Sequence, residues 1–431
     1  MAITTKRIIK KVRSCSCSMP GVWRAVAHTE GAAVIYHSPK ACSHISRVMD
    51  GGDHFRKIAR DEYEPNNFTV PLVCSSLKEK HSIFGGIEQL RECLVYVIST
   101  YQPKFIMIAN SCVAGVIGDD VVAVAQEVEM KQQVPILTVP CYGFLDGEYY
   151  AGYYYAAAAI IERLLKKSMV RPNTVLLIGD QGGPNGEYCR EVKRLLQYFD
   201  VEVIGQFPTY TNYSEYDKIG ESALNIVLGS RGQANEWLIK IADKLRQQLG
   251  TPYYATEFPV GWESTQKWLL GLGEVLGKKE IAKQAVCSEN KKLAEVYALA
   301  KNNLHDKKCI ICIGRLAQFF EPGWIINLVR KSGMIITAII MLEAFTEKAK
   351  QEMIAKMPDI DQSLIIDQSA GNPYLDKADL ILTTHELADY TAKQLFLPLL
   401  PKSGIQGEIN LLQKIRFLLA RRGNKGGIIY G

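Results

Sequence analysis

Short apolar runs alternate with helical stretches along almost the whole chain, and this rhythm limits the fold more than any other feature. The runs are rich in β-branched residues and include AAVIYH, KFIMIAN, VPILTV, TVLLIG, LNIVLG, CIICIG and DLILTT. A strand followed by a helix, repeated many times, is typical of parallel sheets whose faces are covered by helices. Many of the runs are continuously apolar, as expected of strands buried on both faces. The pattern therefore predicts an α/β fold.

The length of 431 residues and two changes in composition predict several lobes. A polar stretch, KKSMVRPN, precedes the run TVLLIG, and a turn-rich stretch, TPYYATEFPVGWEST, precedes a long helical pattern. We predict three Rossmann-like lobes with parallel sheets covered by helices. The predicted divisions are an N-terminal segment 1–19, a first, cluster-binding lobe 20–165, a second lobe 166–265, and bridging helices with a third lobe 266–431. In such sheets ligands bind at the carboxyl ends of the strands.

Composition argues against several classes of protein. Apolar residues make up 47% of the chain and charged residues 22%, which is enough for a packed core and unlike a disordered chain. The net charge of +6 is small for this length, and no dense basic stripe is present, so we expect no nucleic acid partner. No run of 18 apolar residues occurs, and cysteines follow the basic N-terminus. We therefore expect no membrane partner and a cytoplasmic location.

Three of the eleven cysteines lie in turns beside a predicted strand or helix end. Cys17 lies in SCSCSMPG, Cys42 in HSPKACSHI and Cys112 in ANSCVAGVIGDD, so the three are 25 and 70 residues apart. Zinc fingers and ferredoxins pack their ligands closely in sequence, whereas dispersed thiols suit a cluster held inside a preformed domain. Three thiolates are one short of four, and Cys15 or another subunit could supply the missing ligand. Spacing alone is equally compatible with three ordinary thiols.

Five other cysteines fit buried or incidental thiols better than ligands. An odd number of cysteines in a long chain with no recognisable secretory signal also argues against a disulfide framework. The C-x-x-C spacing in CIICIG imitates a redox pair, but both thiols share one strand instead of opening a helix. These five residues are Cys93, Cys189, Cys287, Cys309 and Cys312.

A series of motifs in the first 160 residues carries a family resemblance. In order, they are C-x-x-P-G beginning at Cys17, HSPKACSH, SLKEKHSIFGGIEQLRE, STYQPKFIMIANSCVAGVIGDDV and VPCYGF. This order resembles component 1 of nitrogenase and its relatives. The similarity continues more weakly through TVLLIGDQGG and CIICIG to DLILTTHELADYTAKQL.

The resemblance implies a homologous α-type subunit as partner, usually in an α2β2 assembly. It also implies an iron-sulfur cluster shared at the subunit interface, of the 4Fe-4S or the 8Fe-7S (P-cluster) type. The family's ligand positions fall on Cys17, Cys42 and Cys112, with Cys15 as an uncertain addition. A separate ATP-hydrolysing iron protein supplies the electrons. Consistently, GLGEVLGKK and GDQGGPNGEY match neither a Walker A loop nor a dinucleotide fingerprint.

Two departures from the family pattern narrow the expected role. The family's α subunit holds a metal-sulfur cofactor with a cysteine and a later histidine, but the matching stretches here have Gly229 and FLPLLPKSGIQGE without a histidine. A metal-sulfur cofactor in this chain's own cavity therefore lacks those anchors, which favours a β-type subunit. A metal-sulfur cofactor or a tetrapyrrole would then belong to the partner subunit. The chain is also shorter than typical nitrogenase β subunits, which argues against dinitrogen reduction.

The resemblance thus predicts the β-type subunit of a nitrogenase-like reductase, an oxidoreductase that relays low-potential electrons to a substrate-reducing site. A methylthioalkane or similar organic sulfur compound is the favoured substrate, followed by a tetrapyrrole and then dinitrogen. No catalytic residue is assigned. An alternative is a scaffold subunit for assembly of the nitrogenase cofactor. A third, weaker reading is a nucleotide-binding α/β protein with inert thiols.

Other residues are open to both structural and functional readings. His37 and His44 flank the second candidate cysteine and could modulate a cluster, although ordinary loop histidines are the more frequent case. Asp119 and Asp120 could donate protons, but acids in the first turn of a helix usually complement its dipole. His385 follows an apolar strand and is left unassigned. The tyrosines of EYYAGYYYAAAA could line a cofactor cavity or an electron path, or pack against a neighbouring helix or subunit, and we favour packing against another subunit.

Overall fold

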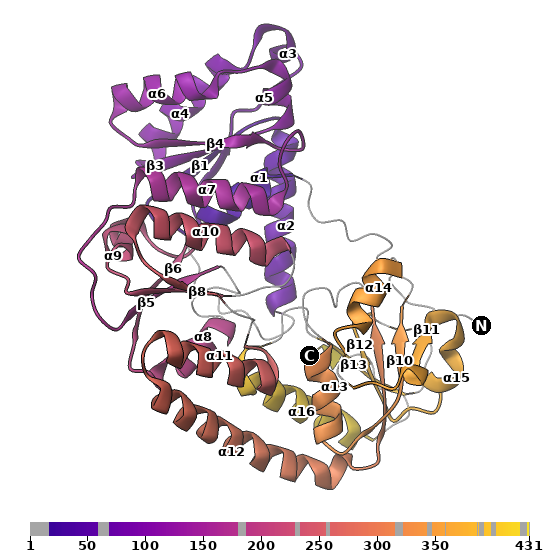
Figure 1. Cartoon of the computed structure of the whole chain (residues 1–431). Coiled ribbons are helices and arrows are strands. Elements are labelled where there is room, and N and C mark those ends of the chain that lie inside the picture. The colour runs from indigo at the N-terminus through magenta and orange to yellow at the C-terminus, as the bar shows by residue number, and fades with distance from the viewer. Residues whose placement is uncertain are drawn as a thin grey trace.

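The computed structural model contains three parallel sheets covered by helices (Figure 1). The structure describes residues 17–58, 69–179, 187–228, 233–255, 259–314, 322–342, 347–357, 359–385, 387, 392–397, 402–422 and 429–430. Cys15 and Gly229 lie outside the described residues, as does most of the predicted segment 1–19. The α/β fold class with three helix-covered parallel sheets is confirmed.

The first sheet has the strand order β2-β1-β3-β4, and all neighbouring strands are parallel. Its central strands are completely buried because helices cover both faces. Phe105 and Met107 of β3 pack with α1 and α7, whereas Ile106 and Ile108 pack with α4 and α6. The elements are α1 (Met19–Val26), β1 (Ala32–His37), α2 (Lys40–Ile58), β2 (Leu72–Cys74), α3 (His81–Phe84), α4 (Ile87–Tyr101), β3 (Phe105–Asn110), α5 (Cys112–Ile117), α6 (Val121–Gln132), β4 (Ile136–Tyr142) and α7 (Tyr149–Arg163).

The second sheet has the order β6-β5-β7-β8 and is also fully parallel. Helices α7 and α10 lie side by side between the first and second sheets (Figure 1), so the two lobes share one continuous core. The elements are β5 (Thr174–Ile178), α8 (Glu187–Gln197), β6 (Glu202–Phe207), η1 (Tyr213–Glu215), α9 (Tyr216–Ile219), β7 (Leu224–Val227), α10 (Gln233–Leu249) and β8 (Tyr253–Tyr254).

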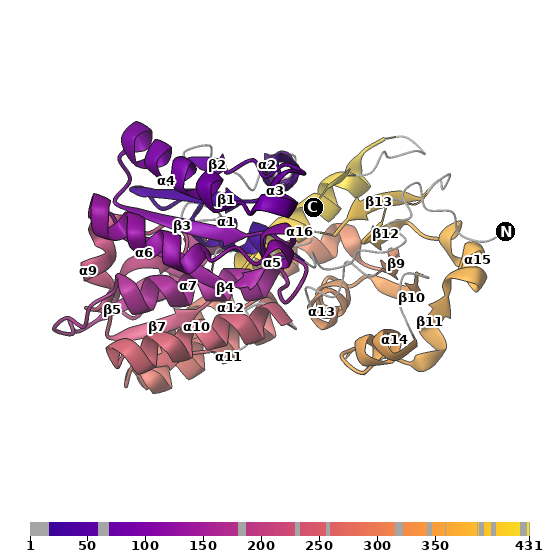
Figure 2. The ribbon, with the colours of Figure 1, turned by 90° about the horizontal axis from the view of Figure 1, so that it is seen from above.

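The third sheet has the order β11-β10-β9-β12-β13-β14, again with parallel neighbours. Figure 2 shows this sheet on one side of the molecule and the first two sheets on the other, with α16 between them. The elements are α11 (Gly261–Val275), α12 (Lys279–Leu304), β9 (Lys308–Ile313), α13 (Gly323–Lys331), β10 (Ile335–Met341), α14 (Glu347–Ile354), η3 (Gln362–Leu364), β11 (Ile365–Asp367), η4 (Gln368–Ala370), α15 (Asn372–Leu375), β12 (Leu380–Thr383), β13 (Lys393–Phe396), α16 (Gly404–Ala420) and β14 (Ile429–Tyr430).

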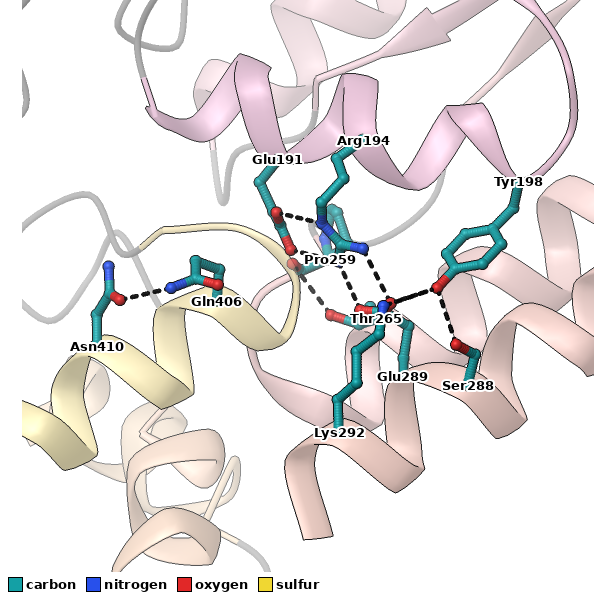
Figure 3. Close-up of polar contacts among 10 residues, drawn as sticks. All are labelled: Glu191, Arg194, Tyr198, Pro259, Thr265, Ser288, Glu289, Lys292, Gln406 and Asn410. Atoms are coloured by element: carbon teal, nitrogen blue, oxygen red, sulfur yellow. Dashed lines mark hydrogen bonds and ion pairs between the residues drawn. The ribbon is translucent and has the colours of Figure 1, made fainter. Parts of the chain in front are cut away.

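A buried ionic network joins the second lobe to the bridging helix α12 (Figure 3). The Arg194 guanidinium lies between the carboxylates of Glu191 and Glu289, with N–O distances of 2.8 and 2.9 Å. Glu289 is fully buried and also accepts hydrogen bonds from Tyr198 and Lys292. Because its charge is compensated on several sides, this carboxylate can stay ionised in the interior.

No helix in the described part of the chain is both long and apolar enough to cross a membrane.

Candidate functional site

The three candidate cysteines lie around the carboxyl end of the first sheet. Cys42 lies in the first turn of α2, shortly after β1, and Cys112 is the first residue of α5, shortly after β3. Cys17 lies two residues before α1. All three are partly buried. The chain passes from β1 to β2 on one side and to β3 on the other, so this edge contains the topological switch point where open parallel sheets bind ligands.

The loop after β4 connects the segment of Cys17 with that of Cys112. The Ser18 amide donates a hydrogen bond to the Gly143 carbonyl oxygen at 3.2 Å. Gly143 has a φ of +56°, and a Cβ at this position would lie 2.9 Å from the Cys112 amide nitrogen. Glycine is required here by both the left-handed backbone and the close approach. Two distant cysteine-bearing segments therefore meet at one glycine.

A close crossing of α1 over α7 positions Cys17 and explains the C-x-x-P-G motif. Pro20 occupies the first turn of α1, where a missing amide hydrogen costs nothing. A Cβ at Gly21 would lie 1.8 Å from the carbonyl oxygen of Tyr149, and one at Gly152 would lie 2.0 Å from that of Ser18. Glycines on both helices thus allow backbone contact.

The thiols at this edge influence one another electrostatically. Burial raises the pKa of Cys42, and the nearby thiols of Cys112 and Cys74 raise it further. Ionising such neighbours is unfavourable unless a cation compensates their charge, and a bound metal does this. Thiolates in partly buried positions are therefore suitable in kind as donors to an iron-sulfur cluster.

Sequence reasoning missed Cys74, which ends β2 at the same edge. Its sulfur donates a hydrogen bond to the Ser38 carbonyl oxygen at 3.1 Å and accepts one from the Ser76 amide at 3.3 Å. Its position directly after the apolar run PLV was the available signal, because the carboxyl ends of parallel strands meet at one edge.

The coordination set is incomplete within the described residues. Among them, no three His, Cys, Asp or Glu side chains form a group that could hold a metal ion by themselves. Cys15 lies outside the described residues, so its participation stays a prediction. Cys17, Cys42 and Cys112 could therefore hold a cluster only together with ligands from outside the described residues.

The five cysteines expected to be buried or incidental take such positions. Cys189, Cys309 and Cys312 are completely buried, and burial raises the pKa of Cys93 to about 12. Cys287 is exposed on α12. Cys93 lies in α4 close enough to Cys74 for the two thiols to influence each other, whereas Cys189, Cys287, Cys309 and Cys312 belong to the second and third lobes and to α12.

His37 and Asp119 form a buried pair that joins the last residue of β1 to the loop after α5. The His37 Nε2 atom lies 2.9 Å from Asp119 Oδ2, and Nδ1 lies 3.0 Å from the Ser75 hydroxyl. The Gly86 amide also donates to the Asp119 carboxylate. Burial lowers the pKa of His37, and Asp119 partly opposes this effect. Both ring nitrogens are engaged by protein groups, which fits the structural reading of this histidine.

The two aspartates have different structural roles. Asp120 caps α6 by accepting a hydrogen bond from the Ala123 amide at 3.0 Å, as expected of an acid at a helix start. Asp119 instead holds His37, a role that required knowledge of the fold. Neither observation assigns a proton-donating function.

The tyrosine-rich segment packs within the chain. Tyr154 and Tyr155 of α7 contact Trp237 of α10, with ring centroids 5.3 and 6.5 Å apart. The Tyr153 hydroxyl lies 3.3 Å from that of Thr209. Tyr154 and Tyr155 therefore pack against a neighbouring helix of the same chain, and the expected packing against another subunit stays a prediction.

Exposed apolar side chains occur on α3 and α5, two helices that pack together near Cys112. Ile83 and Phe84 of α3 are 78% and 84% exposed, and Val116 of α5 is 77% exposed. Helix α3 packs against α5. A Cβ added at Gly115 of α5 would contact the side chain of Leu145, which is also exposed. Grouped apolar side chains of this kind mark surfaces that bind other proteins.

The fold and this site define a class of protein. It is an α/β protein with three parallel sheets, and partly buried thiols and exposed apolar side chains lie at the carboxyl end of its first sheet. The chain belongs to the family described as nitrogenase component 1 type oxidoreductase, whose family model matches residues 17–413. The predicted membership of the nitrogenase component 1 superfamily is therefore confirmed.

The named relatives include cofactor biosynthesis proteins and chains of the nitrogenase molybdenum-iron protein. The chain is 26% identical over 344 residues to the nitrogenase iron-molybdenum cofactor biosynthesis protein NifE of Clostridium pasteurianum, covering 79% of this chain and 70% of that protein. It is 24% identical to the nitrogenase molybdenum-iron protein alpha chain of Methanosarcina barkeri, covering 66% of this chain and 52% of that one. It is 25% identical to the nitrogenase molybdenum-iron protein beta chain of Bradyrhizobium diazoefficiens, covering 72% and 62%. The match thus spans about half of the alpha chain.

A solved structure shares the fold. The structure titled "Nitrogenase Cp1 at pH 6.5" superposes with a TM-score of 0.64 at 17% identity, covering 97% of this chain and 94% of that chain. The two chains therefore share their fold.

Proposed function

We propose that this chain is the β-type subunit of a nitrogenase-like reductase and holds part of an inter-subunit iron-sulfur cluster through Cys17, Cys42 and Cys112. The observation that carries the proposal is the convergence of these three segments on one edge of the first sheet. When bound, such a cluster accepts and passes on single electrons. The remaining ligands would come from a homologous α-type subunit, with Cys15 as a possible addition from this chain.

The chain's own residues prepare this edge for the cluster. The His37–Asp119 pair and Gly143 fix the loops that carry the thiols, so that the ligands need little reorganisation on binding. The exposed apolar rim formed by Ile83, Phe84 and Val116 supports burial of the site under a partner subunit. A covered site excludes water, which influences the potential of a cluster.

The electron donor and substrate follow from the family resemblance. An ATP-hydrolysing iron protein would supply low-potential electrons, and the favoured substrate is a methylthioalkane, ahead of a tetrapyrrole and dinitrogen. No described residue distinguishes these substrates, and the substrate-reducing site with its metal-sulfur cofactor or tetrapyrrole is expected in the partner subunit.

A second candidate function is that of a cofactor-assembly scaffold. The observation that favours it is that relatives from Clostridium pasteurianum, Rippkaea orientalis and Klebsiella pneumoniae are named NifE cofactor biosynthesis proteins. Because relatives named alpha and beta chains of nitrogenase also match, the family alone does not decide between the two.

The deciding experiment is anaerobic purification of the chain with its homologous partner, followed by addition of an iron protein and ATP. ATP-dependent reduction of a methylthioalkane, a tetrapyrrole or dinitrogen supports the reductase. Transfer of a metal cofactor to an acceptor protein without reduction supports the scaffold. Purification of the chain as an iron-free monomer under these conditions contradicts both.

A further inference from the structure

A fully buried tyrosine lies between the segments that carry Cys17 and Cys42. Tyr36 is the last residue but one of β1, a strand that is buried at every position. This strand pairs with β2 on one side and with β3 on the other, so its backbone is a fixed platform. Phenylalanine would supply the same apolar ring, whereas a buried hydroxyl is unfavourable unless it forms hydrogen bonds. The partners of the Tyr36 hydroxyl therefore indicate what it does.

The Tyr36 hydroxyl joins two helices. It donates a hydrogen bond to the Met19 carbonyl oxygen at 2.8 Å and lies 3.0 Å from the Ser46 hydroxyl. A carbonyl oxygen can only accept, so the single phenolic hydrogen points to Met19 and the Ser46 hydroxyl donates in the second bond. Ser46 is buried as well. Both hydrogen bonds are therefore shielded from solvent.

Both partners lie close in sequence to candidate ligands. Met19 is the first residue of α1 and follows Cys17 by two residues. Ser46 follows Cys42 by four residues on α2, which places it one helical turn later on the same face. Helices α1 and α2 also contact each other. One hydroxyl on a fixed strand thus connects the two helices that carry or follow these thiols.

The segment of Cys112 is attached to β1 in a different way. The amide and the hydroxyl of Ser111 both donate to the His37 carbonyl oxygen, at 3.2 and 2.9 Å. This attachment uses the backbone of β1 and does not involve the Tyr36 side chain. Loss of the Tyr36 hydroxyl should therefore leave the segment of Cys112 in place.

We infer that Tyr36 is a positioning residue whose hydroxyl holds the Cys17 and Cys42 segments at a fixed separation, so that both thiols can bind one cluster. The inference deepens the proposed function and rests on it for the identity of the bound group. Loss of a group that orients metal ligands without touching the metal typically lowers metal affinity by about 10- to 100-fold. The Tyr36 hydroxyl orients two ligand-bearing segments at once.

Thiol labelling of the full-length chain without iron tests the positioning directly. A maleimide is added, and mass spectrometry follows the rate of labelling at each cysteine. Tyr36→Phe should raise the rates at Cys17 and Cys42 by about 5-fold, the effect on local opening of losing one hydrogen bond of usual strength. The rate at Cys112 should stay unchanged. Ser46→Ala should accelerate only Cys42, because the bond from the tyrosine hydroxyl to α1 remains.

Controls separate positioning from general loosening of the chain. Tyr254→Phe is the matched control, because the buried Tyr254 hydroxyl also donates to a helix carbonyl oxygen, that of Trp268, at 3.0 Å. It should leave both rates unchanged. Unchanged rates at the two thiols in Tyr36→Phe overturn the inference, as does an acceleration that the buried Cys189 shares in both Tyr36→Phe and Ser46→Ala. If Tyr36→Phe is unfolded, an unchanged second thiol in Ser46→Ala overturns it.

The anaerobically purified complex supplies a second readout. In Tyr36→Phe, the chelator bipyridyl should remove the iron at an about 10-fold lower concentration, and the midpoint potential of the cluster should shift. An unchanged potential overturns the inference, because a merely structural role of Tyr36 would affect stability alone. A native complex without an iron-sulfur cluster contradicts the proposed function instead, and the labelling rates then decide the inference by themselves.

Discussion

Replacing Gly21 with alanine tests the close crossing that positions the first cysteine. A Cβ at Gly21 would lie 1.8 Å from the Tyr149 carbonyl oxygen and 2.9 Å from the Tyr153 amide nitrogen, both backbone atoms of α7. Real Cβ atoms essentially never show contacts below 3.0 Å, so the helices must separate by about 1.2 Å, the difference between 3.0 and 1.8 Å. Neither backbone atom can rotate away as a side chain could.

The cost of this separation is set by the burial of α1. Forcing extra volume into a packed core costs about 1–3 kcal/mol. All eight residues of α1 are buried, so moving the helix opens gaps along its whole length and places the cost at the upper end. The better helix propensity of alanine offsets at most about 1 kcal/mol. We therefore expect the free energy of unfolding to fall by about 2 kcal/mol.

Urea unfolding followed by circular dichroism measures this change through the midpoint and slope. The control is Gly205→Ala, because a Cβ at Gly205 would lie 3.1 Å from the Thr211 side-chain oxygen and 3.6 Å from the next atom, so that a shift of a few tenths of an ångström makes room for it. Its expected effect is below about 0.5 kcal/mol. Iron content of the complex should also fall in Gly21→Ala, since Cys17 leads directly into α1. Unchanged stability together with full iron content would refute this reasoning.

The remaining predictions concern buried charges. Arg194→Met leaves the fully buried Glu289 without its main counter-charge. The free energy of unfolding, measured by urea unfolding, should therefore fall by about 3–5 kcal/mol. A loss below about 1 kcal/mol would contradict the buried ionic role of Arg194. Burial lowers the pKa of His37 below 6.5, so its contribution to stability is present above pH 6.5 and is lost as the pH falls through the lowered pKa. The unfolding midpoint should therefore fall as the pH is lowered from neutrality through about 6.5, the ordinary pKa of histidine, and His37→Gln should reduce that fall. An equal fall in the variant would assign the dependence to other groups.

The fold class could be predicted from sequence because hydrophobic pattern and strand burial are directly related. The run KCIICI is buried at every position after the first, which is what a continuous apolar run predicts for a strand covered on both faces. The sharing of one core by the first two lobes could not be predicted in this way. It depends on the packing of α7 against α10, and no local pattern specifies which helices meet.

The candidate site was predictable only in part. The turn positions of Cys17, Cys42 and Cys112 indicated strand and helix ends, but their common edge follows from the strand order of the first sheet. The contact of His37 with Asp119, 82 residues away, has no signature in local sequence. The glycines of the α1–α7 crossing likewise become interpretable only when the two helices are known to touch.

The most direct measurement for the account as a whole is the Mössbauer spectrum of the anaerobically purified complex, compared between the native chain, Cys112→Ala and Cys287→Ala. Cys287 is exposed on α12 and serves as the matched control. The account predicts an iron-sulfur spectrum that changes in Cys112→Ala and is identical to the native spectrum in Cys287→Ala. A native complex without iron-sulfur signals, or a spectrum unaffected by Cys112→Ala, would contradict the proposal that this edge of the first sheet holds the cluster.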